Sequence, residues 1–440
     1  MTAIVWFRRD LRVEDHPALA EAASAGSVLP VFVNDPSLRD AASARRARFE
    51  ESLAALHAAT EGALVVRSGD PLEVLPQLVR EVGASSVHVT AAVTPYGRRR
   101  DHDVASRLTE QGAALVTTGT AFAIPPGTLL TGSGTPYRVY TPFSRAWRDH
   151  GAPPPRRPTQ VKWVRGPAGD ELPAVEATEP VLLRWRRFLD SDLEHYDAER
   201  DRPDLDTTSR LSAPLALGEV HPRTLLADVA RHPAGRSEGA RRFVGELCWR
   251  EFSADTLWHN PEAAWSDLRP DLSAMTYDEA GAQVEAWRAG HTGFPLVDAG
   301  MRQLLGEGWM HNRVRMVTAS FLVKDLHVRW QVGAEHFLHH LIDGDLASNS
   351  GNWQWVAGTG VDAAPYFRIF NPVAQGLRFD PDGAYVRRWV PELAHLPGAA
   401  AHEPWRHPAG YARGYHPRIV DHAEERTEAL DRYNLARGRP

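Results

Sequence analysis

The segments richest in groups that could do chemistry lie in the last third of the chain, at Trp309–Met316 and Asp343–Trp355. The first combines asparagine and arginine with indole and thioether side chains, and the second begins with two aspartates around a glycine. Burying such polar groups among Trp and Met costs free energy unless each is paired. A ligand site therefore explains both segments better than a hydrophobic core does. The aspartates could accept hydrogen bonds from ring N–H groups or bind a metal.

Metal binding is the weaker of these alternatives. The aspartates do not belong to an Asp/Asn-rich loop with the distal glutamate that an EF-hand requires, so calcium is not favoured. The single cysteine, Cys248, excludes a disulfide framework and any cysteine-based metal or iron–sulfur site. We therefore predict no metal centre.

Two further groups of residues have a chemical and a structural interpretation. Glu246, Trp249 and Arg250 share one face of a predicted helix, where they could receive a polar aromatic ligand. The alternative is an ion pair beside a core tryptophan. The run Thr207–Ser212 places hydroxyls and an arginine at a predicted helix start, which favours an anion. The alternative there is an ordinary N-cap with a solvated arginine.

The first 130 residues alternate short apolar runs with helical segments such as Ala41–Ala59. The runs are nearly continuous in apolar character, as expected for strands buried on both faces. This pattern predicts an α/β N-terminal domain with a parallel five-stranded sheet and helices on both faces. The predicted strands are Ala3–Phe7, Val28–Asn34, Ala63–Gly69, Ser86–Thr90 and Ala114–Thr120.

A dinucleotide held by a glycine-rich turn is not favoured in this half. The turn after the first predicted strand is Arg8–Arg12, whose side chains are too bulky for close approach of a phosphate. The chain also has no Walker-type phosphate-binding motif.

The rest of the chain is predicted to be a linker followed by an all-helical domain. The segment Gly151–Pro173 is rich in Pro and Gly, which is typical of a surface connection. From about Val181 onward the pattern is helical, with long periodic stretches at Gly239–Trp258 and Gly308–Trp330. We therefore predict an α/β domain at residues 1–130, a linker at 131–190 and an all-helical domain at 191–440.

Composition indicates a soluble globular protein of more than one domain, with 440 residues, 43% hydrophobic and 24% charged. The net charge of −6 does not by itself suggest nucleic acid, so a DNA-binding surface would have to be local. No signal peptide or run of about eighteen apolar residues is present, so we predict a cytoplasmic protein without a membrane span.

The motifs resemble those of the photolyase–cryptochrome family, specifically the microbial class I cyclobutane-dimer photolyases. The likeness spans nearly the whole chain, and its long, ordered motifs make chance agreement remote. The matching stretches are VWFRRDLRVEDHPAL, YTPFSRAW, TTSRLS, ELCWREF, HTGFPLVDAGMRQL, GWMHNRVRMVTASFLVKDL, LIDGDLASNSGNWQW and DAAPYFRIFNP. The resemblance implies an N-terminal antenna domain and a helical domain that binds a folded FAD.

The resemblance also implies which residues bind the flavin. Asp343, Asp345 and Asn349 are expected against the isoalloxazine, with Asn349 near N5 and Arg315 paired with Asp343. The full set implied for FAD is Tyr196, Thr208, Ser209, Arg210, Leu211, Ser212, Glu246, Arg250, Arg315, Asp343, Gly344, Asp345 and Asn349.

The implied reaction is blue-light repair of cyclobutane pyrimidine dimers in DNA. Excited reduced FAD donates an electron to a flipped-out dimer, the cyclobutane ring opens, and the electron returns. The dimer pocket is expected to use Glu246, Trp249, Asn312, Arg313, Met316 and Trp355, and DNA phosphates are expected at Arg200, Arg313 and Arg368.

Four positions depart from the usual pattern of the family. Trp353 and Trp330 match the inner residues of a three-tryptophan wire that reduces the flavin, but the outer position holds Tyr277. Phe243 stands where relatives often have tryptophan near the flavin. Tyr96 and Gly97 replace the Asn-Glu pair of folate-binding relatives. This favours an 8-hydroxydeazaflavin-type antenna over methenyltetrahydrofolate, with an empty cleft as the alternative.

The main competing function is that of a cryptochrome, a blue-light photoreceptor without repair activity. Signalling members often carry a long tail, whereas here the closing segment Tyr415–Asp421 is followed by one charged helix. A (6-4) photolyase is disfavoured by the His-Asn-Arg run at positions 311–313, and a dark oxidoreductase by the lack of a nicotinamide motif. We predict a monomeric repair enzyme.

Overall fold

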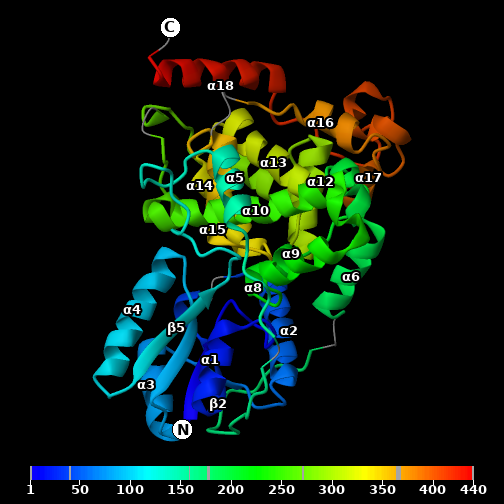
Figure 1. Cartoon of the computed structure of the whole chain (residues 1–440). Coiled ribbons are helices and arrows are strands. Elements are labelled where there is room, and N and C mark those ends of the chain that lie inside the picture. The colour runs from blue at the N-terminus through cyan, green and yellow to red at the C-terminus, as the bar shows by residue number, and fades with distance from the viewer. Residues whose placement is uncertain are drawn as a thin grey trace. The chain divides into compact units, whose positions relative to one another are not determined.

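A computed structural model describes residues 2–38, 41–157, 159–175, 179–269, 272–362 and 368–438 (Figure 1). Contacts along the chain group it into two compact units. The first unit contains Met1–Glu194 and Ser209–Pro261, and the second contains His195–Thr208 and Glu262–Pro440. The predicted domain limits at residues 130 and 190 stay predictions.

The first unit is built on a parallel five-stranded sheet, as predicted. The strand order is β3-β2-β1-β4-β5, and every pairing is parallel. Each strand overlaps the corresponding predicted run to within two residues at either end. The strands are β1 (Thr2–Phe7), β2 (Ser27–Asn34), β3 (Val65–Ser68), β4 (Ser86–Ala91) and β5 (Ala114–Thr120).

Helices cover both faces of this sheet because both faces of its central strands are apolar. Ile4 and Trp6 of β1 belong to one buried cluster, whereas Val5 and Phe7 belong to another. Successive side chains of a strand point to opposite faces, so the two clusters lie on opposite sides of the sheet. The helices between the strands are α1 (Pro17–Ala25), α2 (Ser43–Ala59), α3 (Pro71–Val82) and α4 (Pro95–Thr109), with a short η1 (Pro36–Leu38).

The described residues of the segment predicted as a linker, 131–190, include two helices. These are α5 (Tyr140–His150) and the first ten residues of α6 (Val181–Ser191). Between them, the described residues of the Pro- and Gly-rich stretch form no helix, and Trp163 makes an isolated bridge to Val28. The first unit ends with α8 (Ser212–Leu217), α9 (Pro222–Arg231), η3 (Pro233–Arg236) and α10 (Glu238–His259).

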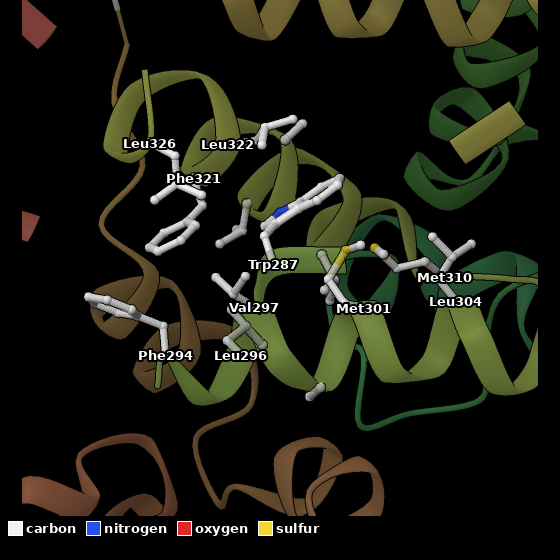
Figure 2. Packing of buried hydrophobic residues seen from close by; sticks show 14 of the residues in the cluster. Trp287, Phe294, Leu296, Val297, Met301, Leu304, Met310, Phe321, Leu322 and Leu326 are labelled. Atoms are coloured by element: carbon white, nitrogen blue, oxygen red, sulfur yellow. The ribbon is translucent and has the colours of Figure 1, made fainter. Parts of the chain in front are cut away.

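The described part of the second unit is helical and packs around one large apolar cluster. Trp287, Phe294, Phe321 and Met301 lie in this cluster, as Figure 2 shows. Its helices are α7 (Tyr196–Glu199), α11 (Ala282–Ala289), α12 (Pro295–Glu307), α13 (Asn312–Ser320), η6 (Phe321–Asp325), α14 (Trp330–His340), α15 (Leu346–Ala357), α16 (Pro372–Phe379), α17 (Ala384–Trp389), η7 (Pro391–Leu393), η8 (Gly398–His402), η9 (Pro404–Arg406) and α18 (His422–Ala436). Two short turns, η2 (Leu193–His195) and η4 (Pro261–Ala264), lie where the chain passes from one unit to the other.

The prediction of one long helical stretch over Gly308–Trp330 is wrong. Helix α13 begins only at Asn312, passes into the π-helical turn η6 and stops at Asp325. His327 has a left-handed φ of 53°, which no right-handed helix allows, and α14 starts afresh at Trp330. The break separates the Asn312 helix from the Trp330 helix. Among the described residues, no helix combines the length and apolar character needed to cross a bilayer.

Candidate functional site

The carboxylate of Asp343 is buried in the second unit and only partly paired. It is 7% exposed, and its Oδ2 accepts a hydrogen bond from Arg315 Nη2 at 2.7 Å. Arg315 is itself anchored, since its Nε donates to the carbonyl oxygen of Met310 at 2.8 Å. The predicted pairing of Arg315 with Asp343 is confirmed.

The second carboxylate oxygen of Asp343 has no hydrogen-bond partner among the described residues. Oδ1 is buried and accepts no hydrogen bond from any described residue. An orphaned buried acceptor costs roughly 1–3 kcal/mol, more when it is charged. The arrangement suits a ligand with an N–H or O–H donor, such as the ring N–H of a flavin, so the residues present fit that cofactor.

Helix α15 fixes the orientation of Asn349. Asp345 caps the helix by accepting from Ser348 N at 2.9 Å, and the backbone N–H of Asn349 donates to Asp345 O at 2.8 Å. The side-chain Nδ2 of Asn349 donates to Ala334 O at 3.0 Å. Because Nδ2 is used in this way, Oδ1 remains the acceptor that a ligand N–H could meet.

Helix α13 carries the polar residues predicted to read DNA. Its N-cap is His311, whose Nδ1 accepts from Arg313 N at 3.2 Å. Asn312 is exposed, and Met316, one helical turn later, is half-buried. Arg313 is not freely solvated, because it pairs with Asp201 at 2.7 Å and lies 4.5 Å over the ring of Phe379.

Four further residues predicted to contact DNA or the flavin in this unit range from half-buried to exposed. Tyr196 and Arg200 lie next to one another, with the guanidinium 5.7 Å from the phenol ring centroid. Arg368 is exposed, and its carbonyl accepts from Lys324 Nζ at 3.2 Å. Trp355 is half-buried on α15 and packs against the apolar cluster of the unit.

Trp353, Trp330 and Tyr277, the residues of the predicted wire, all lie in the second unit. Trp353 is 3% exposed and meets Phe337 edge-on, with centroids 5.0 Å apart. Gly333 permits this packing, because a Cβ there would lie 2.1 Å from the Trp353 ring. Tyr277 is partly buried with Arg329 4.8 Å over its ring, and burial raises its pKa to about 12.

In the first unit, the run Ser209–Ser212 does lie at a helix start, because α8 begins at Ser212. Arg210 has a left-handed φ of 52°. Ser209 Oγ accepts a hydrogen bond from Leu211 N at 3.4 Å, so this hydroxyl stabilises the turn before the helix.

Helix α10 carries Glu246, Trp249 and Arg250, and two of them make contacts that the sequence did not predict. Trp249 stacks face to face on Tyr140 of α5, with ring centroids 3.5 Å apart and planes at 5°. Arg250 donates to the carbonyl oxygens of Ala121 at 3.0 Å and Leu215 at 3.2 Å. The stacking partner Tyr140 had no predicted role, although it lies in the YTPFSRAW motif.

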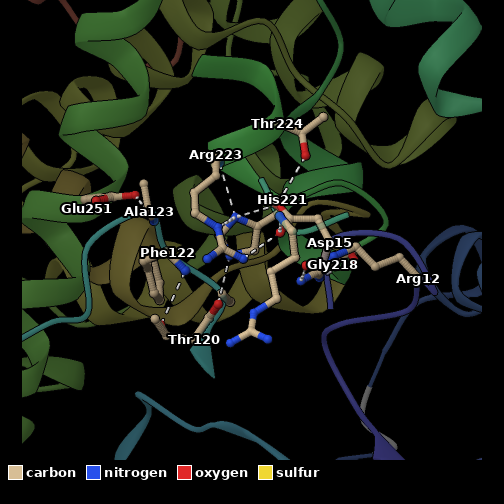
Figure 3. A network of polar contacts seen from close by, with 12 residues as sticks. Arg12, Asp15, Thr120, Phe122, Ala123, Gly218, His221, Arg223, Thr224 and Glu251 are labelled. Carbon is tan, nitrogen blue, oxygen red and sulfur yellow. Dashed lines mark hydrogen bonds and ion pairs between the residues drawn. The ribbon is translucent and has the colours of Figure 1, made fainter. Parts of the chain in front are cut away.

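A buried polar network anchors α10, and no sequence motif predicted it (Figure 3). Glu251 accepts hydrogen bonds from Ala123 N, Ile124 N and Trp147 Nε1. Burial raises the pKa of this carboxyl, and those bonds oppose the rise. The neighbouring contacts join Asp15 to Arg223 at 2.7 Å, His221 Nε2 to Thr120 O at 2.9 Å, and Arg12 Nη1 to Gly218 O at 2.9 Å.

A second polar cluster lies where β1 and β4 end. The guanidiniums of Arg8 and Arg100 lie 4.7 and 4.6 Å from the ring of Trp6, respectively. Tyr96 donates to Asp35 Oδ2, and Arg100 also lies 5.6 Å from the Tyr96 ring. The strand order reverses between β1 and β4, and ligands of doubly wound sheets bind beyond the carboxyl ends of strands at such a point.

Two family models match this chain. The model described as DNA photolyase matches residues 3–160, and the model described as the FAD binding domain of DNA photolyase matches residues 243–435. A deoxyribodipyrimidine photo-lyase of Streptomyces griseus is 41% identical, over 99% of both chains. The chain belongs to the DNA photolyase family. The predicted family, lyase class and FAD-binding helical domain are thereby confirmed.

Solved structures similar to this chain share its fold over nearly its whole length. A bacterial class III photolyase from Agrobacterium tumefaciens aligns with a TM-score of 0.91 at 37% identity, covering 99% of this chain and 98% of that one. A cryptochrome of Synechocystis aligns with a TM-score of 0.89 at 27% identity, covering 98% of each chain. The assignment to class I within the photolyase family stays a prediction.

Proposed function

We propose that this photolyase splits cyclobutane pyrimidine dimers using FAD bound against Asp343 and Asn349. The observation that carries the proposal is the buried Asp343 carboxylate, with one oxygen held by Arg315 and the other left for a ligand N–H. When bound and reduced, FAD supplies an excited-state electron for the dimer. Arg315 holds the carboxylate of Asp343 in one orientation, so that its second oxygen can position the flavin ring.

Asn349 provides the second polar contact of the proposed flavin site. Its Oδ1 would accept a hydrogen bond from the protonated N5 of the reduced ring, which favours the reduced state that repair requires. Asp345, Gly344 and Tyr196 remain assigned to FAD by resemblance. The same resemblance assigns to FAD the run Thr208–Ser212, Glu246 and Arg250. Arg250 has a structural role as well, because it donates hydrogen bonds to two carbonyl oxygens.

The proposed substrate is a dimer extruded from the duplex. Photolyases are among the enzymes that act on flipped-out bases, and a damaged, badly stacked site lowers the cost of extrusion. We assign readout of the dimer to Asn312, Met316 and Trp355, and to Glu246 and Trp249. Arg200, Arg313 and Arg368 are assigned to phosphates. The ion pair of Arg313 with Asp201 would exchange for a phosphate when DNA binds.

We assign electron supply to the flavin to Trp353, Trp330 and Tyr277. An oxidised flavin must be reduced before it can repair, and buried aromatic residues are groups that can lose and regain an electron. Trp353 and Trp330 are 3% and 1% exposed, whereas Tyr277 is only partly buried, as expected for the outer end of a wire.

For the antenna we propose an 8-hydroxydeazaflavin-type pigment at the cluster of Trp6, Tyr96 and Arg100. The proposal is supported by the position of the cluster at the switch point of the sheet and by its stacked aromatic and cationic groups. An absorption band of the purified protein beyond those of FAD, from a host that makes the pigment, is the expected result.

The decisive experiment illuminates dimer-containing oligothymidine with FAD-loaded, reduced protein. We expect restoration of intact thymines under blue light and none in the dark. The similarity to a cryptochrome makes a photoreceptor the second candidate. If light reduces the flavin but no thymine is restored, the photoreceptor function replaces repair. Monomeric state and cytoplasmic location stay predictions.

A further inference from the structure

Asp267 contacts the indole of Trp330, and none of the roles assigned above uses it. Trp330 is 1% exposed, and its Nε1 donates to Asp267 Oδ1 at 2.6 Å. An N–H group bonded to a carboxylate forms a charge-assisted hydrogen bond, stronger than one between neutral groups. Indole has only this one polar hydrogen, so Trp330 commits it entirely to Asp267.

The backbone on both sides of Asp267 is anchored to neighbouring helices. Gln354 of α15 makes two hydrogen bonds to this segment. Its Nε2 donates to Ala263 O at 2.9 Å, and its Oε1 accepts from Leu268 N at 3.1 Å. Ser350 Oγ donates to Ala264 O at 2.8 Å, and Gln331 Nε2 donates to Trp265 O at 3.1 Å. These bonds tie the segment to the helices that carry Trp330 and Trp353, so the carboxylate is held at the indole.

The other end of the proposed wire lacks a comparable acceptor. The hydroxyl of Tyr277 is buried and has no hydrogen-bond partner among the described residues. Burial is the main cause that raises the pKa of Tyr277 to about 12. The negative charge of Asp267 adds to this rise, and Arg329 opposes it. The phenol therefore holds its proton firmly, whereas the proton of Trp330 already points at a base.

From this geometry we infer that Asp267 positions Trp330 and accepts its indole proton when Trp330 is oxidised. The inference rests on the wire proposed above. Trp353 passes one electron to the photoexcited, oxidised flavin and takes one from Trp330, which is left one electron short. The Nε1–H bond then breaks, and the proton passes to Asp267 Oδ1, giving a neutral indole radical and a carboxylic acid. A thiol reductant in solution later returns one electron, and Asp267 returns the proton.

This proton transfer would lengthen the lifetime of the charge-separated state. A positively charged radical attracts the electron back, and an indole radical cation is a far stronger acid than the neutral indole. Moving the proton to Asp267 removes the positive charge from the ring, so that the electron stays on the flavin longer. Asp267 is thus a positioning residue that acts through Trp330.

The test follows the radical of Trp330 by transient absorption after a blue pulse, in FAD-loaded oxidised protein. Tyr277→Phe serves as the background, so that the oxidising equivalent stops at Trp330. Asp267→Asn is then added, because an amide keeps an oxygen for the indole N–H but cannot take its proton. With the aspartate we expect the deprotonated radical. With the amide we expect the protonated radical and return of the electron about tenfold faster, which is about 1.4 kcal/mol in the barrier.

Glu262→Gln is the matched control, since Glu262 is an exposed carboxylate in the same segment. It should leave the radical spectrum and lifetime unchanged. If Asp267→Asn has as little effect as this control, the inference is overturned.

Deuterated buffer gives a second readout, which needs no substitution at Asp267. In the Tyr277→Phe protein, deuterium should slow loss of the indole proton and so delay the change from the protonated to the deprotonated radical. A deprotonated radical that forms equally fast in both solvents would contradict the proposed transfer.

Failure of the wire and failure of this inference are distinguishable. If Trp330→Phe photoreduces the flavin at the parental rate, the wire itself is absent. If Trp330→Phe blocks photoreduction while Asp267→Asn leaves the radical deprotonated, only the role of Asp267 is lost.

Discussion

Arg315 and Asp343 form an ion pair, half-buried at the guanidinium and buried at the carboxylate, that uses only one of the two carboxylate oxygens. The guanidinium is also bonded to the carbonyl of Met310, which restricts it from swinging round to serve both oxygens. The oxygen without a hydrogen bond destabilises the protein when no ligand is bound, and a ligand N–H that donates to it would remove this cost. In the proposed flavin site, this asymmetry would link the stability of the helical unit to cofactor binding.

Arg315→Met should strip the protein of FAD and lower its free energy of unfolding by about 3 kcal/mol, because it leaves a buried carboxylate without a counter-charge. Denaturant unfolding and the flavin-to-protein absorbance ratio measure both effects. Arg388→Met is the control, since its pair with Glu307 is largely exposed, and it should cost under about 1 kcal/mol. If both variants lose equal amounts of stability and of bound FAD, the pair of Arg315 and Asp343 matters no more than an exposed ion pair.

Gly333→Ala should disturb Trp353, because the new methyl group would lie 2.1 Å from its ring. We expect a loss of about 1–3 kcal/mol in stability from overpacking, together with slower flavin photoreduction. Gly281→Ala is the matched control, because the methyl group added there would meet no atom within 4 Å. Unchanged photoreduction in a folded Gly333→Ala protein would argue that the position of Trp353 is not critical.

Tyr277→Phe should slow or alter photoreduction of oxidised flavin, while repair by pre-reduced protein persists. Phenylalanine keeps the ring packing but is much harder to oxidise. Photoreduction with an external thiol donor and repair of oligothymidine dimers are measured side by side. A variant that photoreduces as fast as the parent would exclude Tyr277 from the wire.

His336 should make the protein less stable in mild acid. Burial, and next the charges of His340 and Arg288, lower its pKa to about 3 from the usual 6.5. Below pH 6.5 the unfolded chain therefore binds a proton that the folded chain does not. Stability then falls as the pH drops from 6.5 toward 3, by at most about 1.4 kcal/mol per pH unit. His336→Gln should flatten the dependence of Tm on pH in this window, whereas His407→Gln, an exposed control, should not.

The sequence determined the parts of this protein that depend on local pattern. Valine-rich runs predicted all five strands, because buried parallel strands need apolar residues on both faces. Periodicity placed α10 to within one residue at each end. The long motifs identified the family, and with it the pairing of Arg315 with Asp343.

Apart from the pair of Arg315 and Asp343, only the tertiary structure decided which partners these polar side chains take. Arg250 bonds to carbonyls of distant segments, Tyr140 stacks on Trp249, and Asp267 meets Trp330 across 63 positions of sequence. No local signal encodes such contacts, because they arise from the packing of elements whose spacing along the chain is arbitrary. The sequence did not predict the helix break at His327 for the same reason. The apolar residues of that stretch keep helical spacing, whereas the backbone conformation at His327 is set by tertiary packing.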